Sequence, residues 1–296
     1  MCAEHEHNEQ CHASHAKLDI IDDEFDQVEL EILRIKDKMT RDLYAKRAEV
    51  ISEIPDFWYY VFEAAPPEIT TYIQRTDFSI VADVKNLTVE RFELPNGHPR
   101  SFSLKFEFSE NGCFENSVLE KKFWWRCAKD GQESYVSEPV EIKWKPGKDL
   151  TNGLLDLAKK VYEEDKAGKH DQNSPAKEAL IKKLDDVNIA TVSFFNMFGY
   201  RGRYITAEES AAAFMELEEK RKARKEGKPP VEEMEDDDDD DEYDFEILHN
   251  AEDLALAIAE DLYPDAIRYF RRGEQLVMKA DIDFDDFDDD TDEEMS

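Results

Sequence analysis

The chain opens with a long amphipathic segment, residues 17–55. Apolar residues recur in it at alternating steps of three and four, which is the a/d spacing of a coiled coil. Charged residues fill the positions between them, and no glycine or proline interrupts the segment before Pro55. The spacing predicts one helix of about 55 Å, because each helical residue adds about 1.5 Å. The apolar positions are Leu18, Ile21, Phe25, Val28, Ile32, Ile35 and Met39.

This apolar stripe has two interpretations. It could pack a long helix onto its own domain, or it could pair with the same stripe of a second copy. We favour the coiled-coil dimer, because the stripe is narrow and charged residues flank it on both sides. The seven residues named above are then the expected dimer interface.

The period of the pattern changes between residues 86 and 145. Phe102, Leu104, Phe106 and Phe108 alternate strictly with polar residues, which is typical of a half-buried strand. Turn sequences containing Asn-Gly or Asp-Gly separate it from similar segments. We therefore expect four strands in an antiparallel meander, at about 86–94, 102–108, 118–127 and 136–144.

The third of these strands places cations beside aromatic residues. Such a mixture could stack nucleic-acid bases. We prefer a strand with its apolar residues inward and its cations outward, because the whole chain is strongly acidic. The residues are Lys121, Lys122, Trp124, Trp125 and Arg126.

Helical patterns fill much of the remaining chain. The expected helices lie at about 63–75, 150–163, 176–187, 206–226 and 248–262. A basic stretch, residues 220–225, ends the fourth of them. It has two equally good interpretations, a nuclear import signal and a solvated helix end.

Charge sets this sequence apart from an average domain. It has 72 acidic and 38 basic residues, a formal net charge of −34. Residues 232–246 hold 12 of the acids, and residues 281–294 hold ten more. Such runs repel themselves, so we expect them to be disordered. The runs have two interpretations: tails that keep the protein in solution, or a polyanion that binds a basic protein. Direct binding of DNA is disfavoured, because phosphates would repel so acidic a chain.

Sequence motifs of catalysis are missing from the chain, including the phosphate-binding loops, the nucleophile elbow and the paired Cys-X-X-Cys. The His- and Cys-rich residues 1–16 match no structural zinc spacing, so we expect a polar disordered terminus. No apolar run approaches the length of a membrane span, which is about 20 residues. The sequence thus favours a soluble binding protein of the cytosol or nucleus, without metal, cofactor or enzymatic activity.

Five segments together resemble one family, and they occur in its order. Each is weak alone, but the set covers roughly residues 18–272. The family is the nucleosome assembly protein family, and the similarity is greatest to its SET-like branch. The segments are Ile54–Trp58, Phe108–Asn116, Glu141–Thr151, Ser193–Phe198 and Ala259–Phe270.

This resemblance implies an α+β fold in a headphone-shaped homodimer. Two long helices (17–55) cross antiparallel, and each chain adds an earmuff domain (56–272) with a four-stranded antiparallel sheet packed by helices. A basic helix and an acidic loop at about 206–247 depart from compact relatives, and we expect them to be an insertion in that domain. Residues 273–296 are expected to be an acidic disordered tail. Core histones would bind acidic surfaces. The expected histone-binding residues are Glu252, Asp253, Glu260 and Asp261, with Asp236, Asp237, Asp238, Asp239, Asp240 and Asp241 as flexible contacts.

The implied function is that of a nuclear histone chaperone in nucleosome assembly or disassembly, with shuttling to the cytoplasm as an option. Two alternatives stay open. One is a SET-like scaffold or inhibitor that binds an enzyme such as a histone acetyltransferase or a phosphatase. The other is a coiled-coil adaptor with an acidic tail, which would lack the strand-containing domain.

Overall fold

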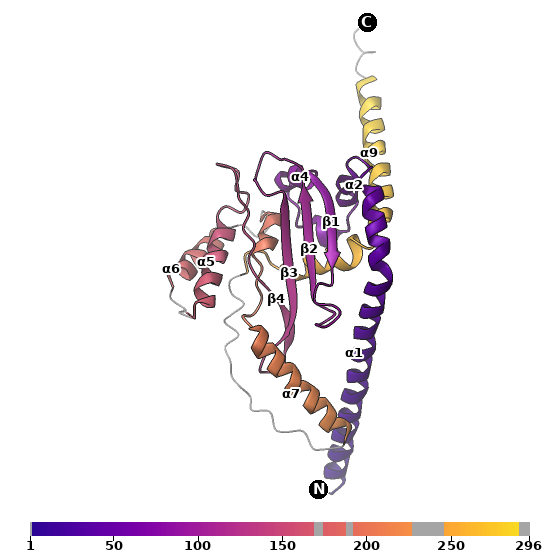
Figure 1. Ribbon diagram of the computed structural model, residues 1–296, viewed down its shortest axis with the longest axis vertical. Helices are drawn as coiled ribbons and strands as arrows, with labels where there is room; N and C mark the ends of the chain where they lie inside the picture. Colours follow the sequence, from indigo (N-terminus) through magenta and orange to yellow (C-terminus); the bar gives the residue numbers. More distant parts are fainter. Residues whose placement is uncertain (1, 169–173, 188–191, 227–245, 290–296) are drawn as a thin grey trace.

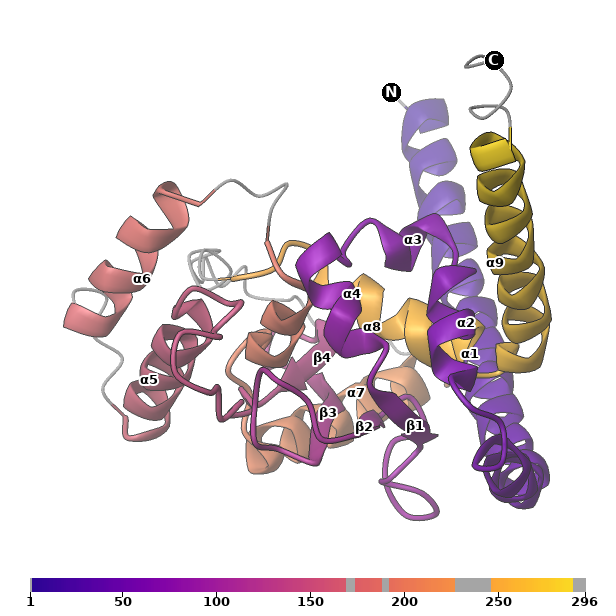
Figure 2. The same ribbon diagram turned by 90° about the horizontal axis from the view of Figure 1, so that it is seen from above.

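The structure, a computed structural model, describes residues 2–168, 174–187, 192–226 and 246–289, with side chains from residue 15 to residue 279 except residue 16. A long N-terminal helix, α1, lies beside an α/β domain (Figures 1 and 2). This arrangement confirms the expected α+β architecture. Within the described residues, none of the helices combines the length and the apolar character needed to cross a bilayer.

Helix α1 spans Cys2–Ile51, which makes it 50 residues long. It begins earlier than the predicted residue 17, because residues 2–16 contain no glycine or proline that would end a helix. A short turn with Asp56 in the left-handed region (φ 55°) then redirects the chain into the domain. Three short helices follow: α2 (Phe57–Glu63), α3 (Pro67–Thr70) and α4 (Arg75–Val81).

The sheet is an antiparallel meander in the order β1-β2-β3-β4, as predicted. The fourth strand was placed wrongly at 136–144: it lies earlier, and Pro139, which has no N–H to donate, follows its end. Residues 138–144 contribute only an isolated bridge between Phe114 and Trp144. The strands are β1 (Val84–Glu90), β2 (Phe102–Phe108), β3 (Val118–Cys127) and β4 (Glu133–Ser137).

The remaining described helices follow the sheet in the chain. The predicted helix 248–262 is observed as α8 followed without a break by one π-helical turn, η4. The last helix, α9, continues beyond residue 272, where the sequence placed the start of the tail. The elements are α5 (Leu154–Lys166), α6 (Pro175–Asp185), the 3-10 helix η2 (Phe194–Gly199), α7 (Ala207–Lys225), α8 (Ala251–Ala257), η4 (Ile258–Leu262) and α9 (Ala266–Asp289).

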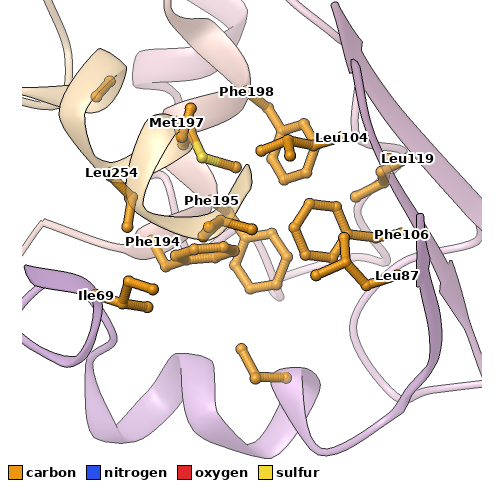
Figure 3. Packing of buried hydrophobic residues seen from close by; sticks show 14 of the residues in the cluster. Ile69, Leu87, Leu104, Phe106, Leu119, Phe194, Phe195, Met197, Phe198 and Leu254 are labelled. Carbon is orange, nitrogen blue, oxygen red and sulfur yellow. The ribbon is translucent and has the colours of Figure 1, made fainter. Parts of the chain in front are cut away.

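The core lies between one face of the sheet and the elements packed on it. Figure 3 shows Leu87, Leu104 and Phe106 of the sheet beside the phenylalanines of η2. All of these side chains are buried, as is Leu254 of α8. The buried Asp77 holds η2 against α4, since Asp77 accepts hydrogen bonds from the Ser193 hydroxyl (2.6 Å) and the Phe194 N–H (2.9 Å). Burial raises the pKa of this carboxyl, against the effect of those hydrogen bonds.

The prediction that the cations of the third strand point outward is wrong for Lys121. Its side chain is fully buried between Leu119 and Phe123 on the inner face of β3. The Lys121 ammonium donates hydrogen bonds to the carbonyl oxygens of Glu138, Phe198 and Tyr200. These three acceptors make burial of the charge tolerable, although desolvation lowers the pKa of Lys121 well below its usual range.

Helix α7 connects the end of the sheet to the N-terminal half of α1 (Figure 1). At the sheet, the Ser210 hydroxyl accepts a hydrogen bond from the N–H of Cys127 (3.0 Å). Phe214 stacks on His98 at 5.4 Å between ring centroids, and His98 stacks in turn on Trp125 at 5.9 Å. The other end of α7 reaches α1 through charged side chains, which are described below.

Candidate functional site

The predicted dimer seam is an exposed apolar stripe along α1. Its seven residues are each between 48% and 70% exposed, and Leu43 and Val50 extend it toward the end of the helix. Leu30, on another face of the same helix, is only 8% exposed. Soluble monomers rarely expose a continuous apolar surface of this extent. The stripe therefore has the character of an interface that a single copy leaves open.

Helix α1 is attached to the domain by other faces. Arg47 donates a hydrogen bond to the carbonyl oxygen of Tyr263 (2.6 Å), and its guanidinium lies 4.3 Å from the centre of that ring. Tyr44 packs on the same tyrosine at 4.8 Å between ring centroids. These contacts fix the C-terminal part of α1 and leave the apolar stripe uncovered.

The first pair of predicted histone-binding carboxylates opens α8. Glu252 is half-buried and accepts a hydrogen bond from the Tyr200 hydroxyl (2.6 Å). Burial raises the pKa of Glu252, and the charge of Asp253 raises it further. Asp253 itself is exposed. Glu252 thus holds α8 against Tyr200, which follows η2, whereas Asp253 faces solvent.

The second pair lies in η4. Glu260 forms an ion pair with Arg91 (3.1 Å), and its side chain remains 53% exposed. Asp261 accepts a hydrogen bond from the Tyr269 hydroxyl (2.7 Å) and lies 3.3 Å from a guanidinium nitrogen of Arg268. Both carboxylates therefore reach solvent while already holding a partner from their own chain.

Glu260 also borders a groove between α1 and the sheet. The groove has a volume of about 720 Å³. Lys36, Asp37 and Arg41 of α1 contribute to one wall, and the end of β1 to the other. Glu260 is thus near the junction of the long helix and the domain. Asp253, the third residue of α8, is not among the groove residues.

The six aspartates predicted as flexible contacts, Asp236 to Asp241, lie outside the described residues. The same holds for the side chains of the acidic run that begins at residue 281. Their contribution to binding stays a prediction.

The structure brings together a second acidic cluster that sequence reasoning missed. Asp23 and Asp26 of α1 lie beside Glu133 of β4, and all three contact arginines. Arg221 of α7 is 3.0 Å from Asp23 and 3.8 Å from both Asp26 and Glu133. Arg224 is 3.3 Å from Asp23. Nothing in the local sequence links these positions, because nearly 200 residues separate Arg221 from Asp23.

The basic stretch 220–225 therefore helps to hold the end of α7 on α1. Three of its cations pair with carboxylates of α1, including Lys225 with Glu24 at 3.7 Å. Lys222 is exposed. The interpretation as a freely solvated helix end is wrong for Arg221, whose side chain is 17% exposed.

Chemically, these surfaces are suited to binding positively charged groups. Among the residues whose side chains are described, no three His, Cys, Asp or Glu gather closely enough to hold a metal ion. The two described cysteines, Cys113 and Cys127, are free thiols, and burial raises the pKa of Cys127 to about 11, which leaves it unreactive at neutral pH.

Comparisons with known proteins agree with this architecture. A nucleosome assembly protein of Schizosaccharomyces pombe is 32% identical over 140 residues, covering 44% of this chain and 57% of the relative. Protein SET of Drosophila melanogaster is 30% identical over 150 residues, covering 50% and 54%. The matches thus span little more than half the length of these relatives.

Solved structures share the fold over most of the chain. The crystal structure of Vps75 aligns with a TM-score of 0.55 at 21% identity, covering 87% of this chain and 96% of that one. The crystal structure of Ccp1 aligns with a TM-score of 0.52 at 25% identity, covering 87% and 94%. The family model of the nucleosome assembly protein (NAP) matches residues 3–273, from α1 through the first turns of α9. The chain therefore belongs to the nucleosome assembly protein family.

Proposed function

We propose that this chain is a homodimeric histone chaperone that assists nucleosome assembly or disassembly in the nucleus, and that it is a binding protein rather than an enzyme. The observation that carries the proposal is the family match over residues 3–273, which includes both the long helix and the domain. The net charge of −34 supports core histones as the ligand, since they are strongly basic.

The exposed stripe on α1 supports the dimer. Two copies of the stripe, crossing antiparallel, would cover the apolar side chains that a single copy leaves in water. Pairing would also place two acidic domains at the ends of one rigid rod. A histone pair could then contact carboxylates from both copies at once, which raises the effective affinity without any new kind of contact.

Binding through dispersed carboxylates explains how a chaperone could hold histones and also release them. Each exposed ion pair contributes only about 0.2–1 kcal/mol, so affinity grows from many contacts and falls with salt. Asp253, Glu260 and Asp261 are candidates on the folded surface, and the six aspartates at 236–241 are candidates in the adjoining acidic run. Glu252 is the weakest candidate, since Tyr200 already engages it.

The test is retention of core histones by the full chain at physiological and at high salt. We expect binding at physiological salt that is largely lost at high salt. The proposal is abandoned if purified protein fails to retain histones under both conditions.

A matched pair of variants tests the folded site. Asp253→Asn with Glu260→Gln should weaken histone binding about three- to ten-fold, since two charge contacts are removed. The control is Glu178→Gln with Asp185→Asn, two exposed acids of α6 on the far side of the domain from α1 (Figure 2). Equal effects of the two variants would mean that histone binding depends on overall negative charge and not on the particular carboxylates of α8 and η4.

A second candidate function is binding of a partner enzyme such as a histone acetyltransferase. It is favoured by a second groove, which is lined by aromatic and cationic side chains. This groove, of about 330 Å³, lies between α5 and the end of the sheet, and a histone would meet cations there. Its lining includes Trp124, Tyr162, Arg126 and Arg203. Tyr204→Ala, also in the lining, should weaken binding of a purified acetyltransferase and leave histone binding unchanged. The reverse outcome would argue against this second function.

A further inference from the structure

The cationic end of α7 lies on an acidic site formed by α1 and β4. Arg221 contacts Asp23, Asp26 and Glu133 at 3.0–3.8 Å, and Arg224 contacts Asp23 at 3.3 Å. The side chains of Asp23 and Glu133 are only 12% and 17% exposed. These two carboxylates therefore face the arginines rather than bulk water, whereas the Asp26 side chain is 41% exposed. Arg100 also lies 3.3 Å from Asp26 and 3.7 Å from Glu133.

The hydrogen bonding of this site is incomplete at one carboxylate oxygen. One oxygen of Asp23, Oδ2, is buried and accepts no hydrogen bond from any described residue, although a guanidinium nitrogen of Arg224 lies 3.3 Å away. A buried acceptor without a donor costs free energy that a better-placed cation would recover. A positively charged ligand could therefore form hydrogen bonds with the acidic site that α7 does not form.

We propose that the end of α7 is an internal competitor for this acidic site, which would otherwise accept a lysine- and arginine-rich segment of a basic partner. The inference rests on the proposed histone-chaperone function and adds a binding site and its regulation. A basic segment of a histone carries the same guanidinium and ammonium groups that α7 presents. It would therefore bind by displacing Arg221 and Arg224, while Arg100 stays beside Asp26 and Glu133.

Displacement of this end does not require α7 to unfold or to leave the sheet. The helix is anchored separately at its other end, where Ser210 bonds to Cys127 and Phe214 stacks on His98. The ion pairs of Arg224 and Lys225 with α1 involve partly exposed cations and are individually weak. The Arg221–Asp23 pair is more buried, but a ligand cation that replaces Arg221 would leave the carboxylate paired. The cationic end is consequently the part of α7 that separates most readily.

The acidic site also stays accessible in the proposed dimer. Asp23, Asp26 and Leu30 share one face of α1 by their spacing of three and four residues. The exposed stripe occupies another face, so a partner helix on the stripe would not cover Asp23. Competition by α7 and pairing of two chains can therefore occur together.

The experiment compares two double variants of the full chain that carry the same formal charge. Arg221→Gln with Arg224→Gln frees the acidic site. Lys148→Gln with Lys182→Gln removes two exposed cations outside α7. In titrations with core histones at physiological salt, we expect the first variant to bind about five-fold more tightly than the second, as loss of two weak ion pairs would produce. Equal affinities of the two variants would refute the inference.

A second measurement covers the case in which the arginine variant folds poorly. Hydrogen exchange of the unaltered protein should become faster in residues 218–225 when a synthetic lysine- and arginine-rich histone-tail peptide is added, and stay the same near Ser210. Unchanged exchange at both places, with the peptide bound, would also overturn the inference. Failure of the unaltered protein and of every variant to bind histones would instead refute the proposed function, and this inference with it.

Discussion

Among single residues, Lys121 has the environment that differs most from its sequence context. It stands beside Lys122 in a strand, and both look like outward-facing cations. In the structure Lys122 is partly exposed, whereas Lys121 points into the core and donates to three carbonyl oxygens. Those carbonyls belong to Glu138, Phe198 and Tyr200, so one ammonium joins β3 to the segment after β4 and to η2.

Lys121→Met tests this role. The variant keeps a side chain of similar length but removes the Lys121 donor from the carbonyls of Glu138 and Tyr200, each of which costs about 1–3 kcal/mol if left unpaired. The Phe198 carbonyl keeps its hydrogen bond from the Val140 N–H (2.8 Å). Removal of the buried charge returns part of that cost. We expect a net loss of roughly 2 kcal/mol in the free energy of unfolding, measured by denaturant titration. Lys122→Met is the control, and an equal loss in both variants would contradict the role of Lys121.

The carboxylates predicted to bind histones stay a prediction, but the structure shows their surroundings. The sequence directed attention to Glu252, Asp253, Glu260 and Asp261, and three of these are seen to be engaged by side chains of their own chain. Periodicity indicates which face of a helix a carboxylate occupies. It does not indicate that a tyrosine 52 residues away will donate a hydrogen bond to it. Tertiary partners of this kind lie beyond any local pattern.

At the scale of elements, long and strongly periodic segments were predicted best. The strands at 102–108 and 118–127 were predicted with their observed bounds, because their apolar residues and flanking turns are unambiguous. The fourth strand was misplaced because apolar residues continue past Ser137, where the chain has already left the sheet. The end of α9 was missed because an acidic run was taken as the start of a tail.

Helix α9 depends on close contact with α2. The backbone of Gly273 comes so near that an added Cβ would lie 2.0 Å from the carbonyl oxygen of Tyr60. Next to this contact, Phe270 stacks on Phe57 at 4.6 Å between ring centroids. Glycine is unfavourable inside a helix, so its presence here is explained by the space that only glycine leaves.

Gly273→Ala should therefore destabilise the protein although alanine favours helix. Overpacking costs about 1–3 kcal/mol, which exceeds the gain of about 1 kcal/mol in helix propensity. Thermal unfolding would show a lower midpoint for this variant. Gly112→Ala provides the control, because nothing lies within 4 Å of the added Cβ and its φ is not positive. A higher midpoint for Gly273→Ala would mean that α9 does not pack on α2 as described.

At the scale of the whole molecule, we expect the exposed stripe of α1 to decide the state of association. Ile32→Asp with Ile35→Asp places two charges at the centre of the stripe, so we expect monomers by light scattering where the unaltered chain gives dimers. Gln27→Asp with Ala45→Asp adds the same charge at exposed positions off the stripe and should leave dimers intact. Dimers in both variants would exclude the stripe as the interface.

The exposed stripe has a consequence for how the protein reaches its native form. If the stripe is the proposed dimer interface, a newly synthesised chain would carry nine large apolar side chains in water along one helix until it meets a second copy. Folding of the helix and association would then be a single event, governed by mass action. The melting temperature should rise with protein concentration, and cells that make too little of this chain would hold it in an aggregation-prone form.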